Sequence, residues 1–205
     1  MKPVYKSHPW HGIPMGEKAP EVVNVFIEIV PTDTVKYEID KETGYLKIDR
    51  PQKYSNVVPA LYGFVPQTYC GEEVAKLARE KSGRDIKEGD GDPLDILVLT
   101  EHAIPHGDLI LKAVPIGGLC LLDKGEADDK IIAVLVGDLI YQHYKDIKEL
   151  PESIVTRLKH YFLTYKNLPD EPNTCEIAYI YGKEEAHDVI RKSMSDYRDL
   201  IFKPI

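Results

Sequence analysis

The chain has few cysteines, no long apolar run and no excess of positive charge. Its cysteines Cys70, Cys120 and Cys175 form no CxxC pair, which excludes a zinc ribbon or disulfide framework and favours reduced thiols in the cytoplasm. The longest apolar run is too short to cross a bilayer, and the first residues lack a secretory signal, so we expect no membrane partner. A formal net charge of -8 argues against a general nucleic-acid partner.

A length of 205 residues, with 43% hydrophobic and 29% charged residues, is typical of a globular protein that buries its own core. Proline recurs through residues 1–20, which predicts an extended N-terminal arm that lies on the domain. His8 and His11 lie in this arm, where the prolines prevent the helix that would align them on a metal. Because no internal repeat or linker is visible, we expect a single domain over residues 1–205.

Hydrophobic periodicity predicts a chain of short strands followed by late helices. A period of two over residues 22–29 predicts a strand, and residues 34–50 predict a β-hairpin around the turn K-E-T-G. Further strands are expected at residues 96–100, 109–116, 119–122 and 131–136. Helical spacing predicts helices at residues 72–81, 151–165 and 184–201. This pattern is typical of a mainly β, α+β fold built on a closed barrel or a sandwich.

The densest group of carboxylates is D-G-D-P-L-D at residues 90–95, directly before the strand that begins at Ile96. Carboxylates packed at the mouth of a strand raise one another's pKa values and destabilise the fold unless a cation compensates. Their hard oxygen ligands favour magnesium, manganese or calcium over zinc. An exposed acidic turn is the alternative, because Asp-Gly and Asp-Pro are common in turns. An EF-hand is excluded, because Leu94 would be a ligand and Asp95 would replace the required glycine.

A second acidic segment, D-K-G-E-A-D-D-K, occupies residues 123–130 between two predicted strands. By itself such a loop is most simply a solvated surface. Beside a second carboxylate cluster, and ending in a lysine, it fits a phosphate group bridged by metal ions. Basic side chains that could neutralise such an anion are Lys36, Arg50, Lys130 and Lys166, although each alone is more simply a surface charge.

The segment D-G-D-P-L-D-I-L-V resembles the signature of soluble inorganic pyrophosphatases of family I. The resemblance continues, in the family's order over most of residues 22–168, through F-I-E-I-V, V-K-Y-E-I-D-K-E-T-G-Y-L-K-I-D-R, Y-G-F-V-P, D-K-G-E-A-D-D-K-I-I-A-V and H-Y-F-L-T-Y-K. It implies an OB-type five-stranded barrel with flanking and C-terminal helices. It also implies Mg2+-dependent hydrolysis of pyrophosphate to two phosphates by metal-activated water, in a homo-oligomer for which a hexamer is typical of bacterial relatives.

The resemblance assigns roles to individual residues. It implies that Asp92 takes the proton of the attacking water. The metal ligands that it implies are Asp90, Asp95, Asp123, Asp128 and Glu38. The substrate contacts that it implies are Lys36, Arg50, Tyr62, Lys130, Tyr165 and Lys166. Glu28 matches an acidic residue that the family uses around the site, through water. Metals and cations suit this reaction because pyrophosphate is a dense anion and its leaving group is another anion.

The chain departs from the family pattern at two places. Val58 stands where many relatives have a tyrosine, which is expected to weaken substrate binding somewhat. Residues 70–89 are longer than the loop of short bacterial forms, and subunit contacts can differ there. Two other functions compete with pyrophosphate hydrolysis: a metal-dependent hydrolase of nucleotides or longer polyphosphates, and a calcium-binding or OB-type nucleic-acid module that keeps the acidic loops for structure.

Overall fold

The structure is a computed structural model that describes residues 6–53, 55–166 and 172–202, so the first five residues of the expected arm lie outside the described residues. The strands are β1 (Val23–Ile29), β2 (Val35–Ile39), β3 (Leu46–Pro51), β4 (Leu61–Phe64), β5 (Asp95–Leu99), β6 (Leu109–Asp123), β7 (Glu126–Ala127), β8 (Lys130–Leu135) and β9 (Cys175–Gly182). The helices are α1 (Glu72–Ser82), α2 (Glu152–Thr164) and α3 (Lys183–Phe202), with 3-10 turns η1 (Tyr141–His143) and η2 (Ile147–Glu149).

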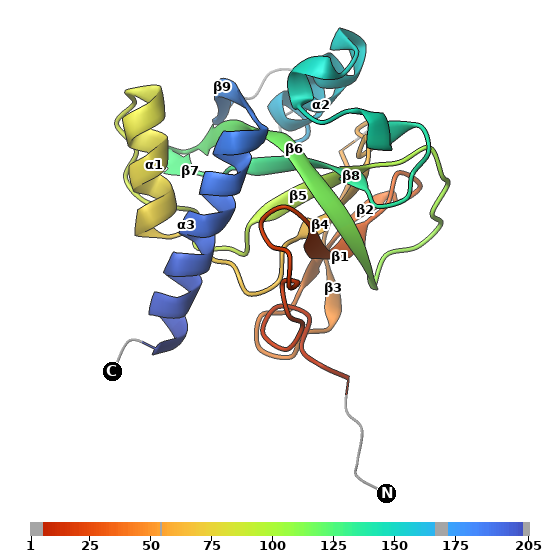
Figure 1. Cartoon of the computed structure of the whole chain (residues 1–205), viewed down its shortest axis with the longest axis horizontal. Coiled ribbons are helices and arrows are strands. Elements are labelled where there is room, and N and C mark those ends of the chain that lie inside the picture. The colour runs from red at the N-terminus through yellow and green to blue at the C-terminus, as the bar shows by residue number, and fades with distance from the viewer. Residues whose placement is uncertain (1–5, 54, 167–171, 203–205) are drawn as a thin grey trace, which may run out of the picture.

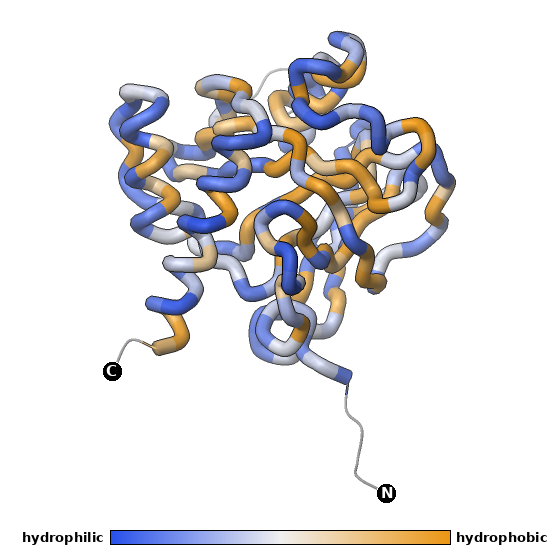
Figure 2. Tube along the Cα trace, viewed as in Figure 1, coloured by the Kyte–Doolittle hydropathy of each residue, from blue (hydrophilic) through white to orange (hydrophobic). Residues whose placement is uncertain are grey.

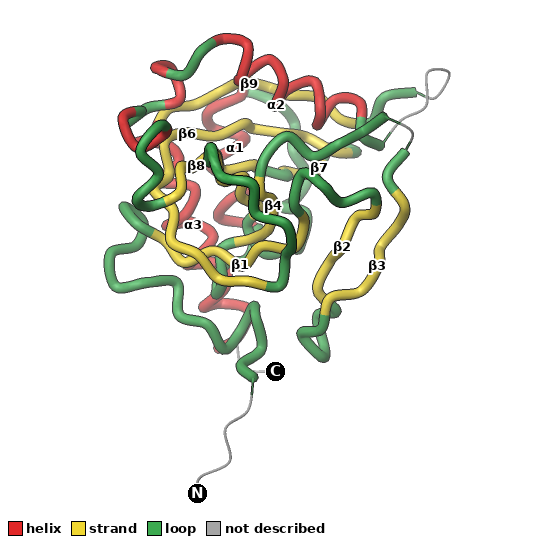
Figure 3. The backbone as a smooth tube through the Cα atoms, turned by 90° about the vertical axis from the view of Figure 1, so that its right-hand side faces the viewer, coloured by secondary structure: helices red, strands yellow, loops and turns green. Residues whose placement is uncertain are grey.

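Five strands form a closed circuit of hydrogen-bonded pairs. The order is β1, β4, β5, β8 and β6, and β6 pairs back with β1. Only the pair β5–β8 in this circuit is parallel. Strands β7 and β9 add to β6, while β2 and β3 form a separate two-stranded sheet that stands beside the circuit in Figure 3. The expected α+β class is confirmed, and the circuit has the connectivity of a five-stranded barrel.

Strand β6 differs from the two strands expected at residues 109–116 and 119–122, because it runs without interruption through Gly117 and Gly118. A register shift between Pro115 and Gly117 accommodates the two glycines. They allow close packing and make no turn: a Cβ atom at Gly118 would overlap the Tyr181 ring of β9. Strands β4 and β9 were not expected as strands. β4 is only four residues long and is buried throughout, so it shows no alternation.

Buried apolar side chains of the circuit form two main clusters, and hydrophobic stretches of the chain are orange in Figure 2. Ile96 and Val98 of β5 belong to one buried cluster, whereas Leu97 and Leu99 belong to another. Phe162 of α2 completes the second cluster. Because β5 is buried on both faces, its sequence after Asp95 is a continuous apolar run. No helix among the described residues is long and apolar enough to cross a membrane.

The described part of the N-terminal segment folds in turns, which differs from the extended arm that we expected. Its Trp10, Ile13 and Met15 side chains are buried. The Trp10 indole donates a hydrogen bond to the Thr68 carbonyl oxygen at 2.7 Å. Burial of these apolar side chains explains why a segment without helix or strand still has a defined path.

Helix α1 lies within residues 70–89, and α3 lies beside it in Figure 1. The buried Asp196 carboxylate of α3 accepts hydrogen bonds from the amides of Gly71 at 3.0 Å, Glu73 at 3.0 Å and Val74 at 3.1 Å. The first amides of a helix have no partner inside the helix, so this carboxylate completes the beginning of α1.

Replacing Asp196 by alanine is expected to destabilise the protein by about 2 kcal/mol, because three amides at the beginning of α1 lose their acceptor. Urea unfolding followed by circular dichroism measures this change. Asp199→Ala, at an exposed position of the same helix, is the matched control. Equal free energies of unfolding for the two variants would contradict the capping role.

Candidate active site

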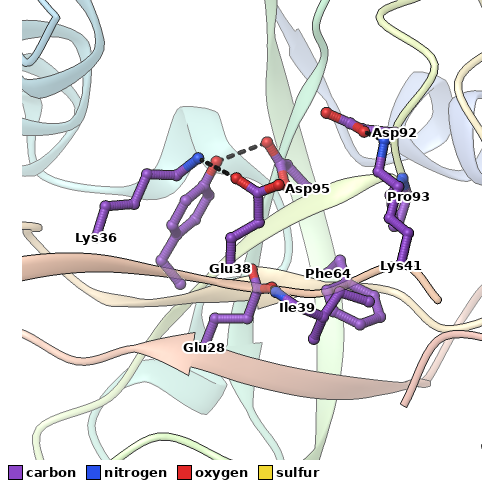
Figure 4. A pocket seen from close by; sticks show the side chains of 10 residues that line it. Glu28, Lys36, Glu38, Ile39, Lys41, Phe64, Asp92, Pro93 and Asp95 are labelled. Atoms are coloured by element: carbon purple, nitrogen blue, oxygen red, sulfur yellow. Dashed lines mark hydrogen bonds and ion pairs between the residues drawn. The ribbon is translucent and has the colours of Figure 1, made fainter. Parts of the chain in front are cut away.

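Many of the predicted residues meet in a pocket between the hairpin and the circuit of strands. Figure 4 shows Lys36, Glu38 and Asp95 on one side of it, and Lys41 and Asp92 on the other. The complete lining is Glu28, Lys36, Glu38, Ile39, Lys41, Tyr62, Phe64, Asp92, Pro93 and Asp95. These residues come from β1, the β2–β3 hairpin with its turn, β4 and residues 92–95, so the pocket forms only when distant parts of the chain assemble.

A buried lysine links the two acidic segments. Asp95 begins β5 and Lys130 begins β8, and the parallel register places them side by side. The Lys130 ammonium contacts Asp95 Oδ2 and Asp128 Oδ1, although Lys130 itself is only 1% exposed. The Tyr62 hydroxyl donates to the same Asp95 oxygen at 2.6 Å. Both acidic segments therefore meet at one point on the edge of the sheet.

This cluster contains more carboxyl groups than ammonium groups. Burial and the neighbouring Asp128 carboxylate raise the pKa of Asp90 well above its usual range. Burial opposes ionisation of Asp128 as well, but the Lys130 ammonium holds the pKa of Asp128 below its ordinary value. Three carboxyl groups, those of Asp90, Asp95 and Asp128, thus face one ammonium group. When these carboxyl groups are ionised, a further cation would balance their charge.

The turn at residues 90–95, here called the signature turn, orients its aspartates in different directions. Gly91 has a φ of 73°, a left-handed conformation that favours glycine. The Asp90 amide donates to the Ala127 carbonyl at 3.1 Å, and the Cys70 amide donates to the Asp92 carbonyl at 2.9 Å. Asp90 is thereby directed inward, whereas the Asp92 side chain remains 45% exposed beside the pocket.

Asp123, at the end of β6, lies in a separate group of contacts. Its Oδ2 pairs with the Lys166 ammonium at 2.6 Å, and its Oδ1 accepts from the Thr174 hydroxyl at 2.9 Å and the Cys175 thiol at 3.4 Å. The Lys166 ammonium also lies 5.3 Å from the centre of the Tyr165 ring. Thr174 and Cys175 were not expected near the site, because Cys175 begins β9, whose pairing with β6 was not predicted from the sequence.

The hairpin positions two of the predicted phosphate contacts. Lys36 and Arg50 face each other across β2 and β3. The Lys36 ammonium lies 3.1 Å from Glu38 Oε2 and 3.3 Å from Asp49 Oδ2, and Asp49 also pairs with Arg50. The Arg50 guanidinium lies 5.8 Å from the centre of the Tyr165 ring. Asp49 was missed by sequence reasoning, although its place next to Arg50 was a usable signal.

Glu28 of β1 connects the hairpin to the circuit of strands. Its buried Oε1 accepts a hydrogen bond from the Ile39 amide of β2 at 2.7 Å. Burial, with a smaller contribution from the charge of Asp95, raises the pKa of Glu28 to about 8, although the Ile39 hydrogen bond opposes the shift. The contact is made directly to the backbone of the strand that carries Lys36 and Glu38.

The donor set fits a hard divalent cation. The carboxyl groups of Asp90, Asp95 and Asp128 can supply oxygen ligands, and a bound cation would favour their ionised forms beside Lys130. Asp123 and Glu38 carry further carboxylates on the β6 and hairpin sides.

A second group with suitable metal ligands, Glu101, His102 and Asp138, lies elsewhere. Asp138 there already accepts four hydrogen bonds, from the Thr100 hydroxyl and from three backbone amides. We therefore interpret Asp138 as the acceptor that orders this turn.

Comparison with known proteins agrees with the geometry. The family model of inorganic pyrophosphatase matches residues 25–198. The chain belongs to the inorganic pyrophosphatase family. It is 51% identical over 203 residues to an inorganic pyrophosphatase of Chlamydia muridarum, covering 97% of each chain. It is 38% identical over 195 residues to soluble inorganic pyrophosphatase 1 of Arabidopsis thaliana, covering 95% of this chain and 82% of that protein.

Solved structures of inorganic pyrophosphatases share the fold. That of Thermus thermophilus superimposes with a TM-score of 0.78 at 29% identity, covering 94% of this chain and 99% of the other. That of Helicobacter pylori gives a TM-score of 0.74 at 33% identity, covering 91% and 98%. These relatives carry the name of an enzyme that hydrolyses pyrophosphate, so the expected family and enzyme class are confirmed.

Val58, the first departure from the family pattern, is fully buried in the apolar cluster that includes Tyr62 and Phe162. It therefore belongs to the same buried cluster as Tyr62, a predicted substrate contact. Its expected effect on substrate binding stays a prediction.

Glu28→Gln is expected to make the metal-free protein more stable than wild type at pH 8, with little difference at pH 4. The folded pKa of Glu28 is about 8 and its ordinary value is 4.5, so between these values the folded chain holds a proton that the unfolded chain has released. Wild-type stability therefore falls as pH rises through this window, by up to about 1.4 kcal/mol per pH unit, and the glutamine variant lacks this loss.

Urea unfolding in the presence of a chelator at both pH values measures the effect. Glu21→Gln, at an exposed position, is the matched control. A constant stability difference between Glu28→Gln and wild type at the two pH values would contradict the raised pKa.

Proposed function

We propose that this chain hydrolyses inorganic pyrophosphate to two phosphate ions and requires Mg2+ to do so. The observation that carries the proposal is the buried cluster around Lys130, which joins the two acidic segments of the family pattern. The pocket beside this cluster is lined by two further lysine side chains, those of Lys36 and Lys41. This combination suits a dense anion that is handled together with divalent metal ions.

Asp90, Asp95 and Asp128 would hold the metal at the buried end of the site, with Asp123 and Glu38 as further ligands. When bound, magnesium supplies charge neutralisation for the phosphates and acidifies a coordinated water. Lys130 orients Asp95 and Asp128 and favours their ionised forms, because its ammonium contacts one oxygen of each carboxylate, although burial still raises the pKa of Asp95. The buried end of the site is therefore prepared for a cation by the chain itself.

The phosphate groups would be bound by cations around the pocket. Lys36 and Arg50 extend from the hairpin, and Lys166 follows α2. A lysine or arginine near the leaving phosphate stabilises the charge that develops there. The Tyr165 hydroxyl can donate to a phosphate oxygen without changing the total charge, and the Tyr62 hydroxyl can do so when its proton turns away from Asp95.

Asp92 would accept the proton of the attacking water. Its side chain is about half exposed at the pocket, in contrast to Asp128, which is 8% exposed. Within the described residues, no side chain or amide donates to Asp92 Oδ2, so this oxygen is available to a water molecule. A base needs this combination of access and a free oxygen.

The homo-oligomer, for which a hexamer is typical of bacterial relatives, and the cytoplasmic location are also part of this proposal. They rest on the resemblance and on the cysteine pattern.

Purified wild-type protein with magnesium is expected to release phosphate from pyrophosphate faster than from ATP or tripolyphosphate. Chelation should reduce the release to background, because the carboxylates around Lys130 would lose their cation. A phosphate-release assay with each substrate measures both effects. Activity unchanged by chelation would contradict the metal requirement, and release from ATP alone would favour the nucleotide hydrolase.

Asp92→Asn keeps the size of the side chain but removes its ability to accept a proton. The turnover number for pyrophosphate is expected to fall by about 10²- to 10⁴-fold. The matched control is Asp108→Asn, since Asp108 is another exposed aspartate paired with a lysine, Lys6, outside the pocket. A turnover number within a few-fold of wild type at saturating magnesium would show that the base is another group.

A further inference from the structure

Lys41, at the tip of the hairpin, contacts the proposed base although the family resemblance assigned it no role. Its ammonium pairs with Asp92 Oδ1 and lies 3.4 Å from the Gly91 carbonyl oxygen. Figure 4 shows it extending past Pro93 toward the Asp92 carboxylate. We propose that Lys41 is a positioning residue that holds the Asp92 carboxylate in the orientation needed to accept a proton. This inference rests on the proposed function.

The backbone that carries Lys41 is held by the hairpin itself. Asp40 Oδ1 accepts hydrogen bonds from the Thr43 amide at 2.9 Å and from the Thr43 hydroxyl at 2.8 Å. The Gly44 amide donates to the Asp40 carbonyl at 2.7 Å, and the Asp40 amide donates to the Tyr45 carbonyl at 2.8 Å. These four bonds close the turn around Lys41. The position of the Lys41 backbone therefore does not depend on the contact between its ammonium group and Asp92.

The N-terminal segment holds the other side of the same turn. His8 Nδ1 lies 3.2 Å from the Trp10 amide and accepts its hydrogen bond, so the ring proton is on Nε2. His8 Nε2 then donates to the Lys41 carbonyl at 3.2 Å. A Cβ atom at Gly44 would lie 2.7 Å from Pro9 Cδ, which shows how closely the two segments pack. The tip is thus held between the N-terminal segment and the signature turn.

The contact restrains Asp92 without occupying it. Lys41 engages Oδ1, whereas Oδ2 receives no hydrogen bond from the described residues. Without Lys41, rotation about the side-chain bonds of this half-exposed aspartate would turn the free oxygen away from the pocket. Correct orientation of a reacting group contributes directly to rate, so loss of the restraint should slow turnover.

The pair contributes little to folding. Both side chains are almost half exposed, at 46% for Lys41 and 45% for Asp92, and ion pairs with that exposure stabilise a protein only slightly. A variant without the lysine should therefore fold normally. Its effect should appear in turnover and not in the midpoint of unfolding.

Lys41→Met tests the proposal, with Lys41→Arg as the conservative variant. Lys47→Met is the matched control, because Lys47 lies on the opposite strand of the same hairpin and also faces an aspartate, with its ammonium 3.8 Å from Asp40 Oδ2, outside the pocket. For Lys41→Met we expect a kcat for pyrophosphate about tenfold below wild type. KM, the magnesium affinity from titration calorimetry and the midpoint of thermal unfolding should change little.

Lys41→Arg should recover most of the turnover, and Lys47→Met should match wild type. In the Asp92→Asn background, Lys41→Met should change kcat by less than about twofold, because its effect acts through the Asp92 carboxylate. A tenfold loss in that background would overturn the proposal, as would a wild-type kcat in Lys41→Met alone.

Two other results would also overturn it. A higher KM at unchanged kcat would make Lys41 a substrate contact, and weaker magnesium binding would give it a structural role in the signature turn. A wild-type protein that releases no phosphate from pyrophosphate would contradict the proposed function and this inference with it. An active wild type with unaffected Lys41→Met would contradict the inference alone.

Discussion

The buried Lys130 ammonium and its two carboxylates are the interaction on which the site depends. A charge that is 1% exposed must be paired, because its removal from water costs far more than one contact returns. Asp95 and Asp128 satisfy this requirement only if β5 and β8 keep their parallel register. Because the Lys130 charge must be paired with both carboxylates, Asp95 of the signature and Asp128 of the second acidic segment must lie next to each other.

Elements outside the circuit of strands add further parts of the site. The β2–β3 hairpin forms its own small sheet, and it joins β1 through the Glu28 carboxyl group and the Ile39 amide. The turn at residues 8–12 supports the hairpin tip from the other side. A pocket built between the circuit of strands and a separately held hairpin combines buried carboxylates with side chains that are exposed to water.

Local sequence patterns predicted the elements in which hydrophobic periodicity and turn residues match the observed structure. The first strand, the hairpin, the three helices and the α+β class follow from periodicity and turn residues, which act over a few neighbouring positions. Prediction was wrong where long-range packing overrides the local signal. Gly117 and Gly118 indicated a break, but they lie inside β6, where the Ile147 side chain packs against Gly117 and the Tyr181 ring packs against Gly118. β4 is buried on both faces and therefore carries no alternation.

The sequence by itself determined which chemical groups are available: the carboxylates of residues 90–95 and 123–128, the lysines near them and the resemblance that relates them to pyrophosphate. Only the tertiary structure decided which of these groups touch. The contacts Lys41 to Asp92 and Thr174 to Asp123 each join residues about 50 positions apart. Such contacts depend on strand register and on the packing of turns, and the spacing of residues along the chain predicts neither of them.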